Sequence, residues 1–197
     1  MAVAVEHDKR RKQILEKALA VFTEDGFEDA TFQKIADRCG ITRTILYLYF
    51  KNKKEIFIFS IKQLLTNVEE DINAIRYDKS LASLDKITNV LTAILSQLEQ
   101  NRHLLSIVLD YLSHLSKNEI NTEDRVRRRT VRLRHILSSM VIEGVKTGEI
   151  KKISVKTADD YLNSFIEAGI YQLGVLKRKD LGELKKAVIF AIKKLAV

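Results

Sequence analysis

The sequence predicts an all-α fold of about nine helices. Residues that interrupt helices are scarce, because proline is absent and the 197 residues include only 7 glycines. Leucine, isoleucine, lysine and glutamate recur at spacings of three and four, which is the periodicity of amphipathic helices. Together these two observations favour a chain that is helical throughout.

The first helices form a small N-terminal group. One helix is expected over about 9–24, with Gly26 as its stop. Thr31 is expected to cap a short helix that ends at a glycine turn, and Thr42 to cap a second short helix that ends near residue 49. With the residues that follow this helix, we assign 1–52 to an N-terminal domain.

Six further helices are expected in a second domain, residues 53–197. Three pairs of residues have the spacing of capping boxes, at which helices begin: Asn52 with Glu55, Thr157 with Asp160, and Asp180 with Glu183. The expected helices cover about 52–75, 81–99, 101–116, 122–148, 157–176 and 180–195.

The composition indicates a cytosolic protein with an anionic partner. Lys and Arg number 34 against 26 Asp and Glu, a formal charge of +8, so the field of the protein attracts nucleic acid or an acidic surface. The single Cys39 excludes an internal disulfide framework and a cysteine zinc site, and it suits a reducing compartment. No apolar run approaches the roughly 18 residues of a membrane span, so we expect a cytoplasmic protein without a membrane partner.

The two short helices have the layout of a helix-turn-helix. A pair of helices joined by a short glycine turn can place its second helix in the major groove of DNA. The apolar inner face that such a unit needs is expected from Phe32, Ile35, Ala36, Ile41, Ile45, Leu46 and Phe50. Short helix pairs with a glycine turn also occur in helical proteins that do not bind DNA, so the layout by itself leaves both alternatives open.

A longer pattern in the same segment carries a family resemblance. Its residues are Thr31, Ile35-Ala36, Gly40-Ile41-Thr42-Arg43, Leu46-Tyr47, Tyr49-Phe50 and Lys53-Lys54-Glu55. In this register the chain resembles the tetracycline-repressor (TetR) family over roughly its first 57 residues. The resemblance implies a transcription regulator with an N-terminal DNA-binding domain and a C-terminal domain for ligand binding and dimerisation.

The resemblance also implies which side chains contact DNA. Those expected to face the major groove are Thr42, Arg43, Thr44 and Tyr47. Arg43 can donate two hydrogen bonds to a guanine edge, and Thr44 can contact a thymine methyl group. The resemblance places Tyr49 near the DNA backbone. Three further residues are expected there because they lie in the first turns of helices, where free amides and the helix dipole attract phosphate: Thr31, Gln33 and Lys53. The basic run at 9–12 is expected to add phosphate contacts.

The middle helices are rich in apolar side chains, most of which must form plain core. The resemblance implies that some line a pocket whose ligand loosens DNA binding, and pockets between helices are usually apolar. The candidate lining residues are Phe57, Leu91, Leu104, Val108, Tyr111, Arg129, Leu133, Ile136 and Phe165.

Arg129 is the one charged candidate. At about 100° per residue it falls about 40° from Leu133, inside an apolar stripe, where an arginine needs a partner. We expect it to pair with a buried carboxylate or with an acidic ligand such as a fatty acyl or aromatic acid. The alternative is that the basic run 125–132 forms a solvated helix face.

The last two predicted helices have broad apolar faces. The resemblance implies that this pair and its copy in a second subunit form a two-fold interface, with contacts from Phe165, Ile166, Gly169, Leu173, Leu184, Val188, Ala191 and Ile192. The alternative is that these helices only cover the core of their own subunit.

The predicted function is a ligand-responsive repressor. A homodimer would bind a near-palindromic operator in double-stranded DNA and leave it when a small, largely apolar effector binds. An enzyme is not expected, because the chain lacks a nucleophile motif and a glycine-rich phosphate loop, and no metal or cofactor is expected. His103, Asp110 and His114 share one side of a helix, but their spacing spans more than about 10 Å, too far for one metal ion. A helical protein-interaction module without DNA binding is the remaining alternative.

Overall fold

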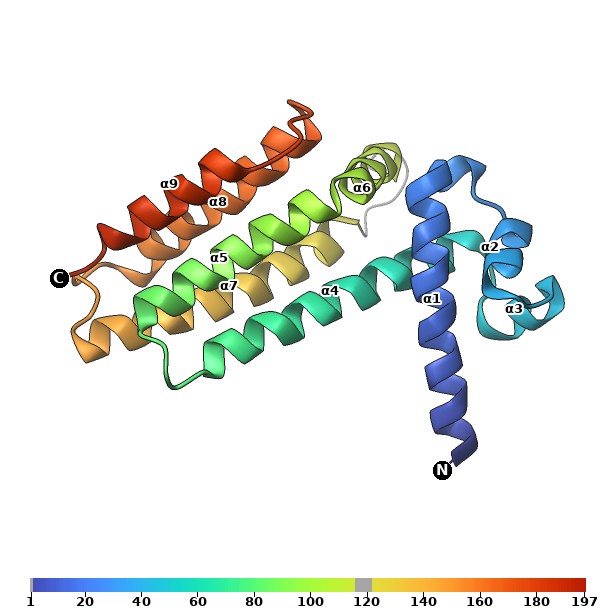
Figure 1. Cartoon of the computed structure of the whole chain (residues 1–197), viewed down its shortest axis with the longest axis horizontal. Helices are drawn as coiled ribbons and strands as arrows, with labels where there is room; N and C mark the ends of the chain where they lie inside the picture. Colours follow the sequence, from blue (N-terminus) through green and yellow to red (C-terminus); the bar gives the residue numbers. More distant parts are fainter. Residues whose placement is uncertain (1, 116–121) are drawn as a thin grey trace. The chain divides into compact units, whose positions relative to one another are not determined.

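The computed structural model describes the backbone of residues 2–115 and 122–197, and the side chains of residues 6–113 and 132–197. Over these residues the chain is helical apart from turns and one isolated bridge between Ile150 and Ala196. The helices are α1 (Ala2–Asp29), α2 (Phe32–Cys39), α3 (Arg43–Tyr49), α4 (Lys53–Tyr77), α5 (Ser83–Gln100), α6 (Arg102–Leu115), α7 (Thr122–Thr147), α8 (Val155–Gly174) and α9 (Gly182–Lys193) (Figure 1). The all-α prediction is confirmed. No helix in the described part of the chain is long and apolar enough to cross a membrane.

The chain divides into two compact units, residues 1–69 and 70–197. Helix α4 crosses this division, whereas the boundary expected from the sequence lay at the start of the helix, between residues 52 and 53. The capping pattern marks where α4 begins, but the first turns of α4 pack with α1 and so belong to the N-terminal unit.

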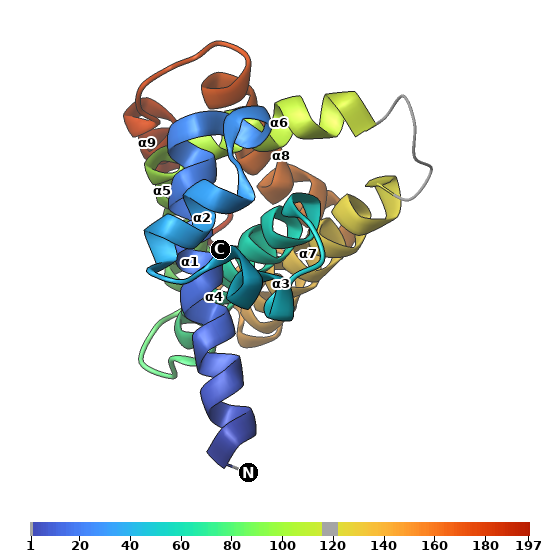
Figure 2. The same ribbon diagram turned by 90° about the vertical axis from the view of Figure 1, so that its right-hand side faces the viewer.

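The predicted caps of α2 and α3 are confirmed. The hydroxyl of Thr31 accepts a hydrogen bond from Lys34 N at 3.2 Å, and that of Thr42 accepts from Ile45 N at 3.3 Å. Gly40 ends α2 in the left-handed conformation with φ of 67°, where a residue with a Cβ atom is strained. Figure 2 shows α2 beside α1 and the turn that leads into α3. These local signals set the angle between the two short helices.

Helix α1 is longer than expected. Its helical backbone begins at Ala2 rather than near residue 9, and Gly26 interrupts it with φ of 80°. The regular helix therefore ends at Gly26, as predicted, and the residues after it form only one further turn.

An aromatic cluster fills the core of the N-terminal unit. The Phe57 ring lies 4.9 Å from that of Phe22 and 5.0 Å from that of Phe27 between centroids. The Ser60 hydroxyl donates to the carbonyl of Leu15 at 2.9 Å and ties α4 to α1. Phe57, a candidate for ligand contact, is fully buried in this cluster.

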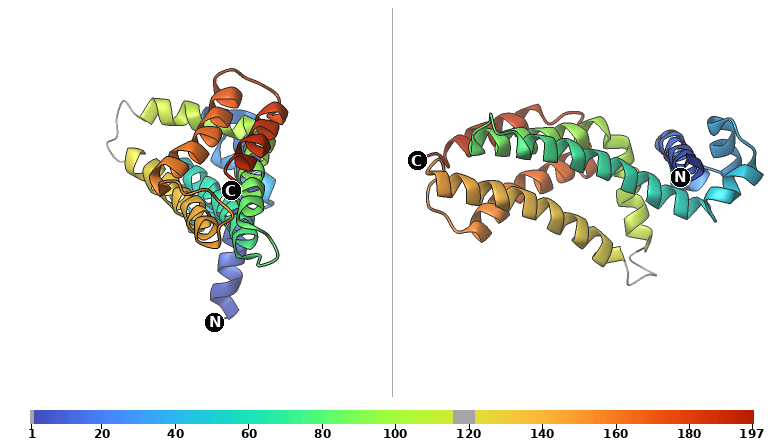
Figure 3. Two further views of the ribbon diagram at one scale, coloured as in Figure 1. Left: turned by 90° about the vertical axis from the view of Figure 1, so that its left-hand side faces the viewer. Right: turned by 90° about the horizontal axis from the view of Figure 1, so that it is seen from below.

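Helix α5 is the centre of the C-terminal unit and packs against α7, α8 and α9, which lie side by side with it (Figure 3). Its inward face is buried along its length through Ile87, Val90, Leu91, Ile94 and Leu95. Burial of such a face supplies most of the stability of a helical bundle.

Two ion pairs fix the ends of this bundle. Lys185 Nζ lies 2.5 Å from Glu99 Oε2, which joins α9 to α5. Lys86, whose side chain is only 6% exposed, lies 3.3 Å from Glu143 Oε1 and joins α5 to α7. A buried lysine requires such a partner.

Two of the three predicted capping boxes are wrong, and the box of Asn52 with Glu55 at the start of α4 is confirmed. Helix α8 begins at Val155, and its cap is Ser154, whose hydroxyl accepts from Thr157 N at 3.1 Å. Thr157 therefore lies inside the first turn of α8, because a serine without an acidic residue three positions later caps the helix. Helix α9 begins at Gly182 after Leu181, without a side-chain cap, and Asp180 accepts from Gly182 N at 3.0 Å.

Candidate functional site

The outward face of α3 is the first candidate site. Thr42, Arg43 and Thr44 are exposed, and the Tyr47 side chain is 50% exposed. The Tyr47 ring stacks on Phe32 of α2 at 4.5 Å with 21° between the planes. Arg43 donates to the Tyr47 hydroxyl at 3.4 Å. The two polar side chains at the centre of this face are thereby held in place before any partner binds.

The residues expected at the DNA backbone flank this face. Gln33 donates to Asp37 Oδ1 at 2.7 Å, and the Thr31 hydroxyl caps α2. Lys53 Nζ donates to the carbonyl of Glu28 at 2.8 Å and lies 4.7 Å from the centre of the Phe27 ring. An ammonium group carries three donors, so Lys53 can make this contact and still bind a phosphate.

Charge on the exposed surface of α2 is largely paired within the unit. Lys34 Nζ lies 2.9 Å from Asp25 Oδ2, and Arg38 Nη1 donates to Glu24 Oε1 at 2.9 Å. The hydrogen bond from Arg38 lowers the pKa of the Glu24 carboxyl below its ordinary value. Arg43 instead contacts a neutral phenol, so this contact leaves its charge available to an anionic partner.

Leu48 also belongs to this face, which the sequence pattern did not predict. Its side chain is 76% exposed, and Ile45, expected in the inner face, is 40% exposed. Helix α3 has seven residues, and Leu46 is the one that is buried. Phe50 is buried just after the helix ends. Leu48 lies about 200° around the helix from Leu46, which is the signal that could have placed it outside.

Cys39 lies behind the site, at the end of α2. Its side chain is buried, and burial raises the pKa of the thiol above its ordinary value. At neutral pH the thiol is therefore protonated and poorly nucleophilic. We expect an aromatic disulfide reagent to label Cys39 only as fast as the N-terminal unit unfolds. Labelling at the rate of a free thiol in native buffer, monitored by absorbance, would contradict this.

Comparison with known proteins identifies the family. Residues 14–58 match the family model described as bacterial regulatory proteins of the tetR family. Over 144 residues, 71% of this chain and 70% of the relative, the sequence is 31% identical to the fatty acid metabolism regulator protein of Bacillus subtilis. The chain belongs to the TetR family of bacterial transcription regulators. As a TetR regulator it is a DNA-binding protein and not an enzyme.

Solved structures share the whole fold. A TetR regulator from Haloarcula marismortui superimposes with a TM-score of 0.79 at 17% identity, covering 96% of this chain and 97% of that one. The regulator FadR of Bacillus subtilis, solved in complex with stearoyl-CoA, has a TM-score of 0.67 at 24% identity and covers 91% of this chain and 96% of its own. These likenesses establish the TetR fold for both units of the chain.

The candidate ligand residues of this TetR chain fall into separate groups. Leu91, Leu104 and Ile136 are buried in the C-terminal unit. The half-buried candidates are Val108, Tyr111, Leu133 and Phe165, from α6, α7 and α8. Phe57 lies in the core of the N-terminal unit, and the side chain of Arg129 lies outside the described residues. The half-buried group is the part of the candidate set that is partly accessible to solvent.

The candidate dimer residues lie mostly inside the subunit. Apart from the half-buried Phe165, all are buried: Ile166, Gly169, Leu173, Leu184, Val188, Ala191 and Ile192. A Cβ atom at Gly169 would lie 2.6 Å from Leu95 Cδ2, so this glycine lets α8 approach α5. We call four exposed residues of the same two helices the outer α8–α9 face: Tyr161, Tyr171, Ile189 and Phe190. Val155, which is exposed at the start of α8, is not included.

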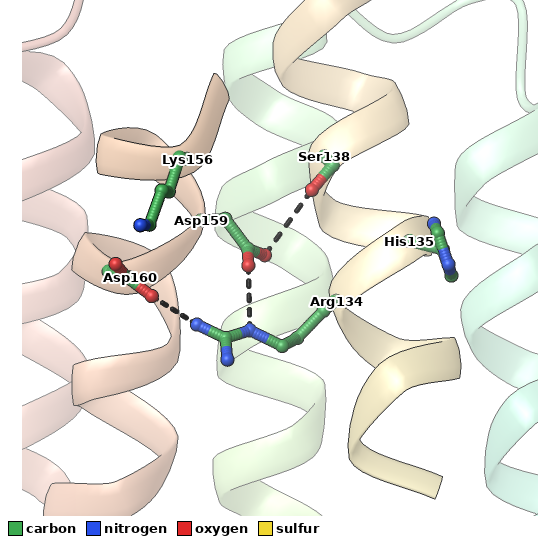
Figure 4. Close-up of a pocket in the computed structure, with 6 residues that line it drawn as sticks. All are labelled: Arg134, His135, Ser138, Lys156, Asp159 and Asp160. Atoms are coloured by element: carbon green, nitrogen blue, oxygen red, sulfur yellow. Dashed lines mark hydrogen bonds and ion pairs between the residues drawn. The ribbon is translucent and has the colours of Figure 1, made fainter. Parts of the chain in front are cut away.

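A polar pocket of about 330 Å³ opens between α7 and α8 (Figure 4). Arg134 Nε donates to Asp159 Oδ2 at 2.6 Å, and the same guanidinium pairs with Asp160. Ser138 donates to the other oxygen of Asp159 at 3.3 Å. The hydrogen bond to Asp159 raises the pKa of Arg134 further. These contacts join α7 to α8. Lys156 also lines the pocket, so the two cationic side chains, Arg134 and Lys156, balance the two carboxylates and the pocket offers no net charge to a ligand.

No group of three or more metal-ligating side chains occurs among the side chains that the structure describes.

Proposed function

We propose that this TetR regulator is a homodimeric repressor whose effector is a long-chain acyl-CoA or a related fatty acyl compound. The observation that carries the proposal is the 31% identity to a fatty acid metabolism regulator over 71% of the chain. The stearoyl-CoA bound to FadR of Bacillus subtilis, a protein of the same fold, supports this ligand class.

The DNA side of the proposal depends on α3. Placed in the major groove, it would present Arg43 and Tyr47 to base edges, with Leu48 available to thymine methyl groups. Both polar side chains are already oriented by their contacts with each other and with Phe32. Less conformational entropy is therefore lost when the helix binds DNA.

The dimer side depends on the outer α8–α9 face. Phe190 is 65% exposed and Tyr171 is 53% exposed, and an interface would bury such large apolar side chains. A second copy related by a two-fold axis would cover this face with the same face of its own. Two recognition helices would then meet the two halves of a near-palindromic operator.

The effector side depends on the half-buried apolar side chains of α6, α7 and α8. Val108, Leu133 and Phe165 are partly accessible to solvent, although their side chains are apolar. Burying an acyl chain against such residues contributes about 0.8 kcal/mol per methylene group. A long chain shifts the population away from the operator complex if more of it is buried in the conformation of the dimer that fits DNA poorly, because only a difference in affinity between the two conformations moves the equilibrium.

Stearoyl-CoA is the probe that tests the effector. At a concentration of 100 times its dissociation constant, the ligand should stabilise the protein by about 2.7 kcal/mol and release it from DNA. Coenzyme A without the acyl chain should do neither. If stearoyl-CoA changes neither the melting temperature nor DNA binding, the proposed effector class is wrong.

A variant at the half-buried group locates the effector site. Val108→Trp is expected to fill the space that the acyl chain uses, so DNA binding persists but stearoyl-CoA no longer releases it. Val155→Trp is the matched control, because Val155 is 40% exposed at the first turn of α8. Equal responses of the two variants to stearoyl-CoA would place the effector elsewhere.

A further inference from the structure

The first turns of α1 contact the last residue of the recognition helix. The imidazole of His7 stacks on the ring of Tyr49 with 4.6 Å between centroids and 21° between the planes. His7 precedes the region in which the sequence predicts helix, and it is within reach of α3 only because α1 starts at Ala2. Tyr49 is one of the residues expected at the DNA backbone.

A second contact lies one helical turn further along the same face of α1. The guanidinium of Arg11 lies 4.9 Å from the centre of the Phe50 ring and 4.3 Å from that of Phe59. Residues four apart share a face of a helix, so His7 and Arg11 form one contact strip. This strip joins α1 to the end of α3 and the start of α4.

Helix α3 has little else to hold its last turn. Leu46 is its one buried residue, and the chain leaves the helix at Phe50 with an extended backbone. Tyr49 is half-buried, and apart from His7 its ring neighbour is Phe50, with 6.4 Å between centroids. The His7 ring therefore supplies the closer packing surface for Tyr49.

We propose that His7 is a positioning residue for DNA binding, which acts by stacking and fixes the Tyr49 ring at the exit of the recognition helix. Stacking restricts the rotamers of Tyr49 before DNA binds, so less freedom is lost in the complex. The imidazole itself makes no essential contact with DNA. The inference rests on the proposed placement of α3 in the major groove.

Substitutions of His7 separate stacking from charge. His7→Ala is expected to weaken DNA binding about 3-fold for each recognition helix, hence on the order of 10-fold for a dimer. His7→Phe keeps a ring on Tyr49 without a polar nitrogen and should retain affinity within about 2-fold. Binding is measured by fluorescence anisotropy, with a duplex that the wild-type protein enriches from random sequence. His103→Ala, an exposed histidine of α6, is the matched control and should bind like the wild type.

A double-mutant cycle with Tyr49→Ala tests whether His7 acts through Tyr49. If it does, adding His7→Ala to Tyr49→Ala changes affinity little, because the stack is already lost. The proposal is overturned if His7→Ala binds DNA like the wild type. It is also overturned if His7→Ala weakens binding as much in the Tyr49→Ala protein as in the wild-type protein. It is also overturned if His7→Phe loses as much affinity as His7→Ala and the salt dependence of binding becomes less steep, since His7 would then contact phosphate itself.

The placement of α3 is tested separately. Thermal unfolding shows whether each variant is folded, and Arg43→Ala measured on the same duplex reports on the recognition helix. Normal binding by Arg43→Ala would count against the proposed DNA contacts, whatever the outcome at His7.

Discussion

Phe190→Asp is expected to dissociate the dimer and to remove most of its affinity for the operator. Phe190 is 65% exposed on α9, and in a two-fold interface the substitution would place two carboxylates in an apolar surface. Each buried and unpaired charge costs about 3–5 kcal/mol. In the dimer, binding of one recognition helix holds the second at a high effective concentration near its half-site. A monomer lacks this gain, so operator affinity should fall about 100-fold or more.

Sedimentation velocity measures the first effect, and anisotropy on operator DNA measures the second. Tyr77→Asp is the control, because it introduces the same charge at a residue that is 68% exposed at the end of α4, away from the outer α8–α9 face. A Phe190→Asp protein that stays dimeric would remove this face from the proposed interface.

Arg43→Ala is expected to relax sequence preference at one base pair. A bidentate arginine–guanine contact discriminates against the wrong base by about 1–3 kcal/mol, which is about 5- to 160-fold. Arg43 is suited to this contact because it is exposed and its hydrogen bond to Tyr47 aligns it along α3. Repeating a random-sequence selection with the variant should show one position per half-site that loses its preferred base.

Loss of positive charge is the other consequence of this change. Arg178→Ala removes one arginine from an exposed turn in the C-terminal unit, so it controls for net charge. If Arg43→Ala and Arg178→Ala select the same motif as the wild type, Arg43 does not contact bases.

The helix-turn-helix could be predicted in detail because its signals are local. Thr31 and Thr42 cap helices through residues three positions away, and Gly40 provides the left-handed turn between them. None of these contacts depends on distant parts of the chain. The helix boundaries that they set are therefore close to those expected from the sequence.

The faces of α8 and α9 could not be assigned from sequence in the same way. A helix that packs on its own subunit and also meets a partner is apolar on two sides, and periodicity does not say which side is which. The structure buries Leu173 and Val188 against the subunit and exposes Tyr171 and Phe190. The interface residues predicted from the sequence therefore lie in the core of the subunit more than on its outer surface.

Contacts between distant segments were also missed. The stack of His7 on Tyr49 joins residues that are far apart in the chain, and the exposure of Leu48 follows from which side of α3 packs on its neighbours. Both depend on the tertiary arrangement of α1, α3 and α4, which residue spacing does not report.

The central claim is that the chain binds a specific duplex sequence through paired recognition helices. Selection of bound fragments from the DNA of the host, followed by a salt titration, tests it most directly. We expect one enriched inverted repeat with half-sites about 34–36 Å apart or a multiple of that distance. We also expect the affinity to fall steeply and linearly on a log–log plot against salt. Absence of an enriched sequence, together with binding that barely responds to salt, would contradict the account and indicate a helical protein-interaction module.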